Sequence, residues 1–253
     1  MIFKTIKYEK YAERAYRKLS SAQKSLRKNY DTDNYANWFY TQSMETLRLY
    51  SGQKEIFFKY IQIGTFSHES KTWLWAWANE NSIEPNRFDM LKVKKIGQTK
   101  KYENLINSQF EGNKQTGWEL SAIAFNIIGG IGVYRAVSDH LEIYLLLSKE
   151  LSKNEVERME SKLIECEAHG KLRQAFVCQH LNRNAKTGFV EAFETSPGMK
   201  LHEEDDLQAW CLECEKRRFE ANGWTDNLMK FSNINLVCER CYFEIKDLHK
   251  SLN

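Results

Sequence analysis

The sequence predicts an α+β protein in which an antiparallel sheet packs with helices, followed by a small zinc-knuckle domain. Three observations support this. Hydrophobic residues make up 42% of the 253-residue chain and aromatic residues 13%, which is enough for a core. Helical and strand-like segments are mixed within the first 150 residues, and two C-x-x-C pairs lie near the end. We expect an α+β domain over 1–152, a linker helix over 153–168 and a zinc-binding module over 169–253.

The first expected element is a helix over residues 8–29. Its apolar side chains recur at three- and four-residue steps and form one stripe: Tyr8, Tyr11, Ala12, Ala15, Tyr16, Leu19 and Ala22. Lysines and arginines fill the opposite face, which favours an ordinary solvated surface. The alternative is a docking face for an acidic protein or a nucleic acid.

Strands are expected over residues 35–78. The segment 57–66 and the segment 72–78 flank a polar turn, which is typical of a hairpin. Alternation in the second strand places Trp73, Trp75 and Trp77 on one face. Three tryptophans on one face favour a core role, but they could instead line a binding pocket with Asn79 at its edge. His68, in the polar turn, is expected to be solvated.

Helices and a hairpin complete the expected first domain. Residues 84–107 predict a helix with Pro85 in its first turn and a break near Gly97. Residues 117–130 predict a second helix that stops at Gly129 and Gly130. Residues 132–137 and 141–147 then form a hairpin that closes the sheet.

The segments at 64–79 and 117–135 resemble a family of uncharacterised bacterial domains. They are "GTFSHESKTWLWAWAN" at 64–79 and "GWELSAIAFNIIGGIGVYR" at 117–135. The resemblance covers about residues 8–150. It implies a shared fold but no activity, because the family carries no established chemistry.

The last third contains the clearest chemical signal, Cys211-x-x-Cys214 and Cys238-x-x-Cys241. Each C-x-x-C bends the backbone so that both sulfurs face one point, and two such knuckles can hold Zn²⁺ tetrahedrally. A spacer of 23 residues is slightly longer than the ~15–20 of the usual pattern. A strand before the second pair and a helix after it favour a treble-clef or ribbon-like module. We therefore predict one closed, structural four-cysteine zinc site.

Cys178 and His180 complicate this prediction, because six ligands exceed one closed site while two sites need eight. Either this pair is a neighbouring structural pair beside the four-cysteine site, or it is a ligand pair and His169 or His202 joins a second site. The main rival to the four-cysteine site combines Cys178 and His180 with one C-x-x-C knuckle. Cys166 is expected to be a small apolar residue of the linker helix. The pattern C-x-H-L, W-C-x-x-C, Gly-Trp, C-x-x-C-Y over about 169–246 resembles a small zinc-binding module of bacterial proteins, which implies that Cys178 and His180 matter to it.

The functional prediction is a non-catalytic bacterial protein that binds another protein, in an immunity (toxin-neutralising) or regulatory role. We expect it in the cytoplasm and not in a membrane, because neither a signal peptide nor a membrane-length apolar run is present. A net charge of +3 argues against a nucleic-acid partner. The alternatives are a small-molecule binder or enzyme with a tryptophan-lined pocket, or nucleic-acid binding through the zinc module.

Overall fold

The computed structural model describes residues 7–79, 82, 84–182, 184–202 and 205–250. The chain divides into two compact units, Met1–Val156 and Glu157–Asn253. Among the helices of these residues, none combines the length and the apolarity that a membrane span requires.

The first unit is built on an antiparallel sheet, which confirms the predicted fold class. Its longest strand, β3, pairs with β2 through its first half, with β4 near its end and with β7 along most of its length. Two register irregularities in the β3–β7 pairing bend the sheet. In the described part of the chain its strands are β1 (Asn37–Thr41), β2 (Thr46–Ser51), β3 (Lys54–Ser67), β4 (Thr72–Trp75), β5 (Gln109–Glu111), β6 (Gly132–Val137) and β7 (Leu141–Leu151).

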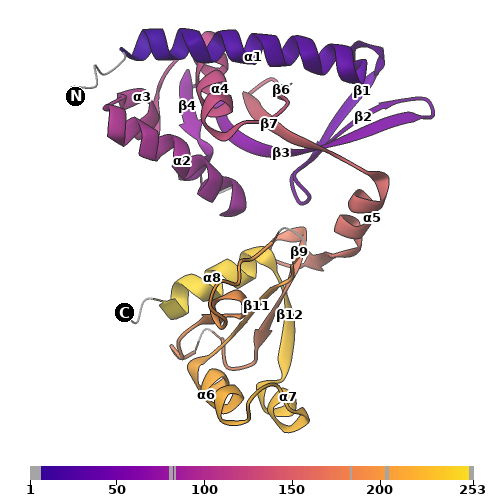
Figure 1. Ribbon diagram of the computed structural model, residues 1–253, viewed down its shortest axis with the longest axis vertical. Helices are drawn as coiled ribbons and strands as arrows, with labels where there is room; N and C mark the ends of the chain where they lie inside the picture. The colour runs from indigo at the N-terminus through magenta and orange to yellow at the C-terminus, as the bar shows by residue number, and fades with distance from the viewer. Residues whose placement is uncertain (1–6, 80–81, 83, 183, 203–204, 251–253) are drawn as a thin grey trace. The chain divides into compact units, whose positions relative to one another are not determined.

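Helices pack on this sheet, and Figure 1 shows α1 running along the unit. They are α1 (Tyr8–Tyr30), α2 (Glu84–Lys100), α3 (Glu103–Ile106) and α4 (Lys114–Ile128), with short 3₁₀ turns η1 (Thr32–Asn34) and η2 (Ala76–Ala78). Helix α2 passes through Gly97 without the expected break. A Cβ at Gly97 would lie 2.6 Å from the Cβ of Leu105, so the glycine lets α3 pack closely against α2.

The tryptophans belong to the core of this unit. Trp73 and Trp75 lie on β4 and are completely buried, in one cluster with side chains of α1, α2 and α4. The expected strand is shorter than predicted, because the chain turns into η2 after Trp75. Trp77 therefore lies on a 3₁₀ turn, where it is 8% exposed.

The second unit is a small sheet flanked by helices. Strand β9 (Gly170–Cys178) is central. It pairs antiparallel with β8 (Leu163–Cys166) and β12 (Ile234–Cys238), and parallel with β11 (Leu207–Trp210). The remaining elements are β10 (Val190–Glu191), η3 (Ala192–Glu194), α6 (Leu212–Glu220), α7 (Asp226–Ser232) and α8 (Glu239–Lys250).

The linker-helix prediction over 153–168 is wrong in its second half. Helix α5 covers Lys153–Ser161, and strand β8 follows it. Pairing with β9 decides this conformation, since Leu163, Ile164, Glu165 and Cys166 face Arg173, Leu172, Lys171 and Gly170 across an antiparallel ladder. Tertiary pairing therefore overrides the local helical pattern.

Candidate metal centre

Cysteines and histidines gather in two groups in the second unit. Site 1 consists of Cys178, His180, Cys211 and Cys214, and site 2 of Cys166, His169, Cys238 and Cys241. In each site the four potential ligand atoms lie within 4.8 Å of one another. All six cysteines are free. The described residues thus form two candidate sites of three cysteines and one histidine each, in place of one group of four cysteines, and site 1 has the rival composition of Cys178 and His180 with one C-x-x-C knuckle.

Both ends of strand β9 take part in this arrangement. Cys178 is its last residue, and His180 follows two positions later. His169 directly precedes its first residue, Gly170, in the turn from β8. One strand therefore separates the two sites: site 1 receives Cys178 and His180 from the end of β9, and site 2 receives Cys166 and His169 from the turn between β8 and β9.

Site 1 is completed at the junction of β11 and α6. Because β11 runs parallel to β9, with Ala209 opposite Val177, its end brings Cys211 beside Cys178. The backbone N–H of Cys211 donates to Sγ of Cys178 at 3.3 Å. Cys211 then caps α6, since its sulfur accepts from the N–H of Cys214 at 3.4 Å. Nδ1 of His180 lies 3.4 Å from Sγ of Cys214.

Site 2 repeats this design at the junction of β12 and α8. Cys238 ends β12, and its sulfur accepts from the N–H of Cys241 in the first turn of α8 at 3.4 Å. Nδ1 of His169 lies 3.4 Å from the sulfurs of both Cys238 and Cys241. Sγ of Cys166 lies 3.9 Å from Sγ of Cys241. A hairpin knuckle facing a helix start is typical of a treble clef.

Polar groups around the sites orient the ligands. The hydroxyl of the buried Ser232 donates to Sγ of Cys214 at 3.2 Å in site 1. In site 2, Nε2 of His169 lies 3.0 Å from a carboxylate oxygen of Glu244. Such outer partners fix the histidine ring and are a regular part of metal sites in proteins.

The thiol pKa values differ within each site. A hydrogen bond from Cys178 lowers the pKa of Cys211 to about 5. The backbone N–H of Ala168 is the main cause that lowers the pKa of Cys166 to about 7. Burial raises the pKa of Cys241 to about 12. Each site therefore contains one thiol that ionises readily. Because metal ions bind thiolates, a metal would have to displace the protons of the other thiols.

The two sites differ in exposure. In site 1 all three cysteines are buried, and the His180 ring lies against Phe231 with ring centroids 4.6 Å apart. In site 2 Cys166 and Cys241 are only partly buried. Site 2 is thus the more accessible of the two.

Sequence reasoning missed two of these residues as ligands. Cys166 was expected to be an apolar helix residue, and His169 was only one of two candidates for a second site. The available signal was the spacing C-x-x-H from Cys166 to His169, which equals the C-x-x-C spacing of the other knuckles. The incorrect helix assignment hid it. His202, the other candidate, belongs to neither group.

The remaining candidates have other roles. Trp73, Trp75 and Trp77 belong to the buried core cluster of the first unit, and Asn79 follows η2. His68 is not simply solvated: its Nε2 lies 3.2 Å from Oε1 of the buried Glu142.

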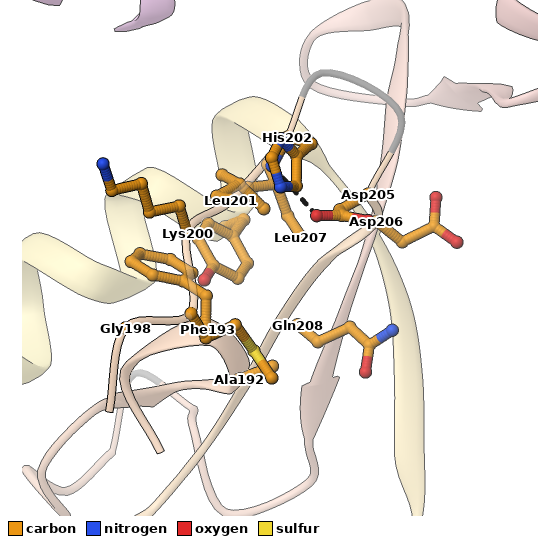
Figure 2. A pocket seen from close by; sticks show the side chains of 12 residues that line it. Ala192, Phe193, Gly198, Lys200, Leu201, His202, Asp205, Asp206, Leu207 and Gln208 are labelled. Carbon is orange, nitrogen blue, oxygen red and sulfur yellow. Dashed lines mark hydrogen bonds between the residues drawn. The ribbon is translucent and has the colours of Figure 1, made fainter. Parts of the chain in front are cut away.

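The second unit also contains a cavity of about 600 Å³. Figure 2 shows Phe193, Leu201 and His202 gathered on one side of it and Asp206 and Gln208 on the other. Two carboxylates that line the cavity already have partners. Asp205 accepts from the backbone N–H of His202 at 2.9 Å, and Asp206 pairs with Lys162 at 3.0 Å. None of the eight ligand candidates lines it.

Comparisons with known proteins place the first unit only. Neither a curated protein nor a solved structure matches the chain. A family model described as a family of unknown function, DUF6882, matches residues 9–150, which is more than half of the chain. The match agrees with the resemblance to an uncharacterised family, and it ends before both metal sites. The chain therefore belongs to the family of unknown function DUF6882.

Proposed function

We propose that the protein binds two zinc ions, one in each site, and that it works without catalysis by binding another protein. The observation that carries the zinc proposal is the spacing of the ligand atoms. A tetrahedral zinc ion has Zn–S bonds of about 2.3 Å and Zn–N bonds of about 2.0–2.1 Å, which set S···S edges of about 3.8 Å and S···N edges of about 3.5 Å. In site 2 the sulfurs of Cys166 and Cys241 lie 3.9 Å apart, and Nδ1 of His169 lies 3.4 Å from the sulfurs of Cys238 and Cys241 and 3.8 Å from that of Cys166. In site 1, Nδ1 of His180 lies 3.4 Å from the sulfur of Cys214.

The number of ligands supports a structural role for both ions. A catalytic zinc commonly has three protein ligands and keeps its fourth position for water or substrate. Each site here supplies four protein ligands, three of them thiols. Four such donors close the coordination sphere. The zinc ions would therefore stabilise the second unit, whose core is small.

Metal content measured by inorganic mass spectrometry tests this proposal. The wild type should contain about two zinc ions per chain. Cys166→Ser and Cys178→Ser should each contain about one, because each change disables a different site. His202→Gln is the matched control and should contain two. A single ion in the wild type that both serine variants retain would contradict the two-site arrangement.

The protein-binding role is supported by the surface of α1. Between Arg14 and Lys28 this helix has six basic residues and no acidic one. Arg17 pairs with Glu13, and Lys18 donates to Asn126. Arg14, Lys24, Arg27 and Lys28 are exposed, and no described carboxylate forms an ion pair with them. Two of them, Lys24 and Arg27, line a groove of about 280 Å³ together with Tyr16, Leu19, Ser20, Gln23 and Trp118.

The chemistry of this groove fits an acidic protein segment with one apolar anchor. The side chains of Lys24 and Arg27 offer positive charge, while Tyr16 and Trp118 offer aromatic surface. The amide of Gln23 is already used on both sides, because it donates to the carbonyl of Val133 and accepts from its N–H. These two bonds hold the Gln23 side chain against the backbone of Val133. An immunity or regulatory protein of the cytoplasm would use such a surface to bind its partner protein and so block that partner's activity.

Fluorescence anisotropy distinguishes an acidic protein from a nucleic acid. The probes are a labelled glutamate-rich peptide with a central phenylalanine and a single-stranded oligonucleotide of equal charge. We expect the peptide to bind more tightly, and Lys24→Glu/Arg27→Glu to abolish its binding. Lys54→Glu/Lys95→Glu changes the net charge equally at exposed sites elsewhere in the first unit and should retain binding. Tighter binding of the oligonucleotide, or equal loss in both variants, would contradict the proposed surface.

A further inference from the structure

Helix α8 connects the two metal sites. Its first turn contains Cys241, and Cys238 directly precedes it, so this end belongs to site 2. One turn further, Glu244 holds the ring of His169. A helix of 12 residues is about 18 Å long, so its other end lies well away from site 2.

The middle and the end of α8 hold strand β10. The carboxylate of Glu191 is 2% exposed and accepts from the hydroxyl of Tyr242 at 3.0 Å, from Lys246 at 3.1 Å and from Lys250 at 3.0 Å. The residue before Glu191 pairs with Trp210 of β11. Trp210 directly precedes Cys211, so these contacts link α8 to the C-x-x-C knuckle of site 1.

The last turn of α8 also holds the loop that follows His180. His249 is 1% exposed, and its Nδ1 accepts from the N–H of Thr187 at 3.0 Å. Its Nε2 therefore carries the proton and donates to the carbonyl of Asn182 at 2.9 Å. The hydroxyl of Thr187 in turn donates to the carbonyl of His180, a ligand candidate of site 1.

We propose that His249 and α8 couple the two sites, so that metal bound in site 2 raises the affinity of site 1. This inference rests on the proposed binding of two metal ions. Metal in site 2 would fix the start of α8, and the fixed helix would hold the knuckle and the histidine loop of site 1 in place. His249 acts as a positioning residue, since it touches neither set of ligands directly.

Thermodynamic linkage makes this coupling reciprocal. A typical coupling between two binding sites changes each affinity by about 5- to 150-fold. Loss of site 2 should therefore weaken site 1 by a factor in this range, and loss of site 1 should weaken site 2 by the same factor. A residue that stabilised only site 1 would change the affinity of site 1 and leave the affinity of site 2 unchanged.

Cadmium NMR with chelator competition can measure both affinities, because each site gives its own resonance. The site-2-disabled chain, Cys166→Ser/Cys241→Ser, assigns the signals and should hold cadmium in site 1 about 5- to 150-fold more weakly than the intact chain does. His249→Gln should weaken site 1 in the intact chain but have a smaller effect in the site-2-disabled chain. Asp247→Asn, an exposed position on the same helix, is the matched control and should change neither affinity.

The possible outcomes separate this inference from the zinc proposal. If the intact chain binds two ions but site 1 has the same affinity with and without site 2, the coupling is wrong and the two-site proposal stands. If the intact chain binds no metal, the two-site proposal itself fails. If the site-2-disabled chain does not fold, His249→Gln in the intact chain still decides, because unchanged affinities there would overturn the role of His249.

Discussion

Nε2 of His169 lies 3.0 Å from a carboxylate oxygen of Glu244, while Nδ1 of the same ring faces the sulfurs of Cys238 and Cys241 at 3.4 Å. The carboxylate therefore selects the tautomer with the proton on Nε2 and leaves Nδ1 free to bind a metal. Because Glu244 lies on α8, three residues after Cys241, one helix supplies both a ligand candidate and the group that orients another candidate.

Replacement of Glu244 by alanine should weaken metal binding at site 2. Loss of an outer partner of a ligating histidine typically lowers metal affinity about 10- to 100-fold. Site-resolved chelator competition would measure this change. Asp247→Ala removes an exposed carboxylate from the same helix and should leave the affinity unchanged. Equal effects of the two variants would mean that only the charge of α8 matters.

Removal of metal should unfold the second unit and leave the first unit folded. Three side chains of the second unit's core cluster, Cys178, Cys211 and Cys214, are ligand candidates of site 1. Binding of a structural zinc ion typically contributes about 10–16 kcal/mol, which exceeds the stability of most domains. Calorimetry in the presence of a chelator should lose one transition and keep the other, and added zinc should restore it. Two unchanged transitions would argue against a structural role for the metal.

Gly64→Ala should destabilise the first unit. A Cβ at this position would lie 2.4 Å from the ring of Trp73 and 2.6 Å from the carbonyl oxygen of Leu74, and neither can move freely. Overpacking of a core typically costs ~1–3 kcal/mol, and we expect the upper end because one obstacle is backbone. Chemical denaturation would measure it. Thr65→Ala, the next strand residue, should cost about 1 kcal/mol or less. A smaller loss for Gly64→Ala than for Thr65→Ala would contradict this packing.

The stability of the first unit should fall at acid pH because of Glu142. Burial alone would raise the pKa of this carboxyl group, but the hydrogen bond from Tyr144 and the charges of Arg135 and His68 outweigh it and lower the pKa. A lowered folded-state pKa stabilises the fold above the unfolded-state pKa, and this stabilisation disappears as the pH falls through the folded-state value.

Glu142→Gln tests this prediction. The variant should be less stable than the wild type near neutral pH, and the difference should shrink as the pH is lowered below the unfolded-state pKa of about 4. Urea denaturation of both proteins across this range would show the change. Asp139→Asn, in the turn of the same hairpin, should follow the wild-type pH dependence. Parallel curves for Glu142→Gln and the wild type would exclude Glu142 as the cause.

The sequence alone predicted most of the first unit, because its signals are local. Helical periodicity located α1, and glycines at 129 and 130 located the end of α4. The hairpin that contains Trp73 was predicted because aromatic residues alternate on both sides of a polar turn. Each of these patterns depends on residues close together in the chain, so the pattern is visible in the sequence itself.

The four knuckle cysteines were also determined by the sequence, since C-x-x-C spacing is a local property. Their grouping was not. Whether Cys211 shares a metal with Cys238 or with Cys178 depends on which strands pair, and the parallel pairing of β11 with β9 places it beside Cys178. Likewise, Cys166 and His169 became ligand candidates only because β8 pairs with β9 in place of continuing a helix. The sequence thus identified the knuckle cysteines, and long-range strand pairing decided which other residues join them and how the eight ligand candidates divide, because contacts between distant segments leave no local pattern.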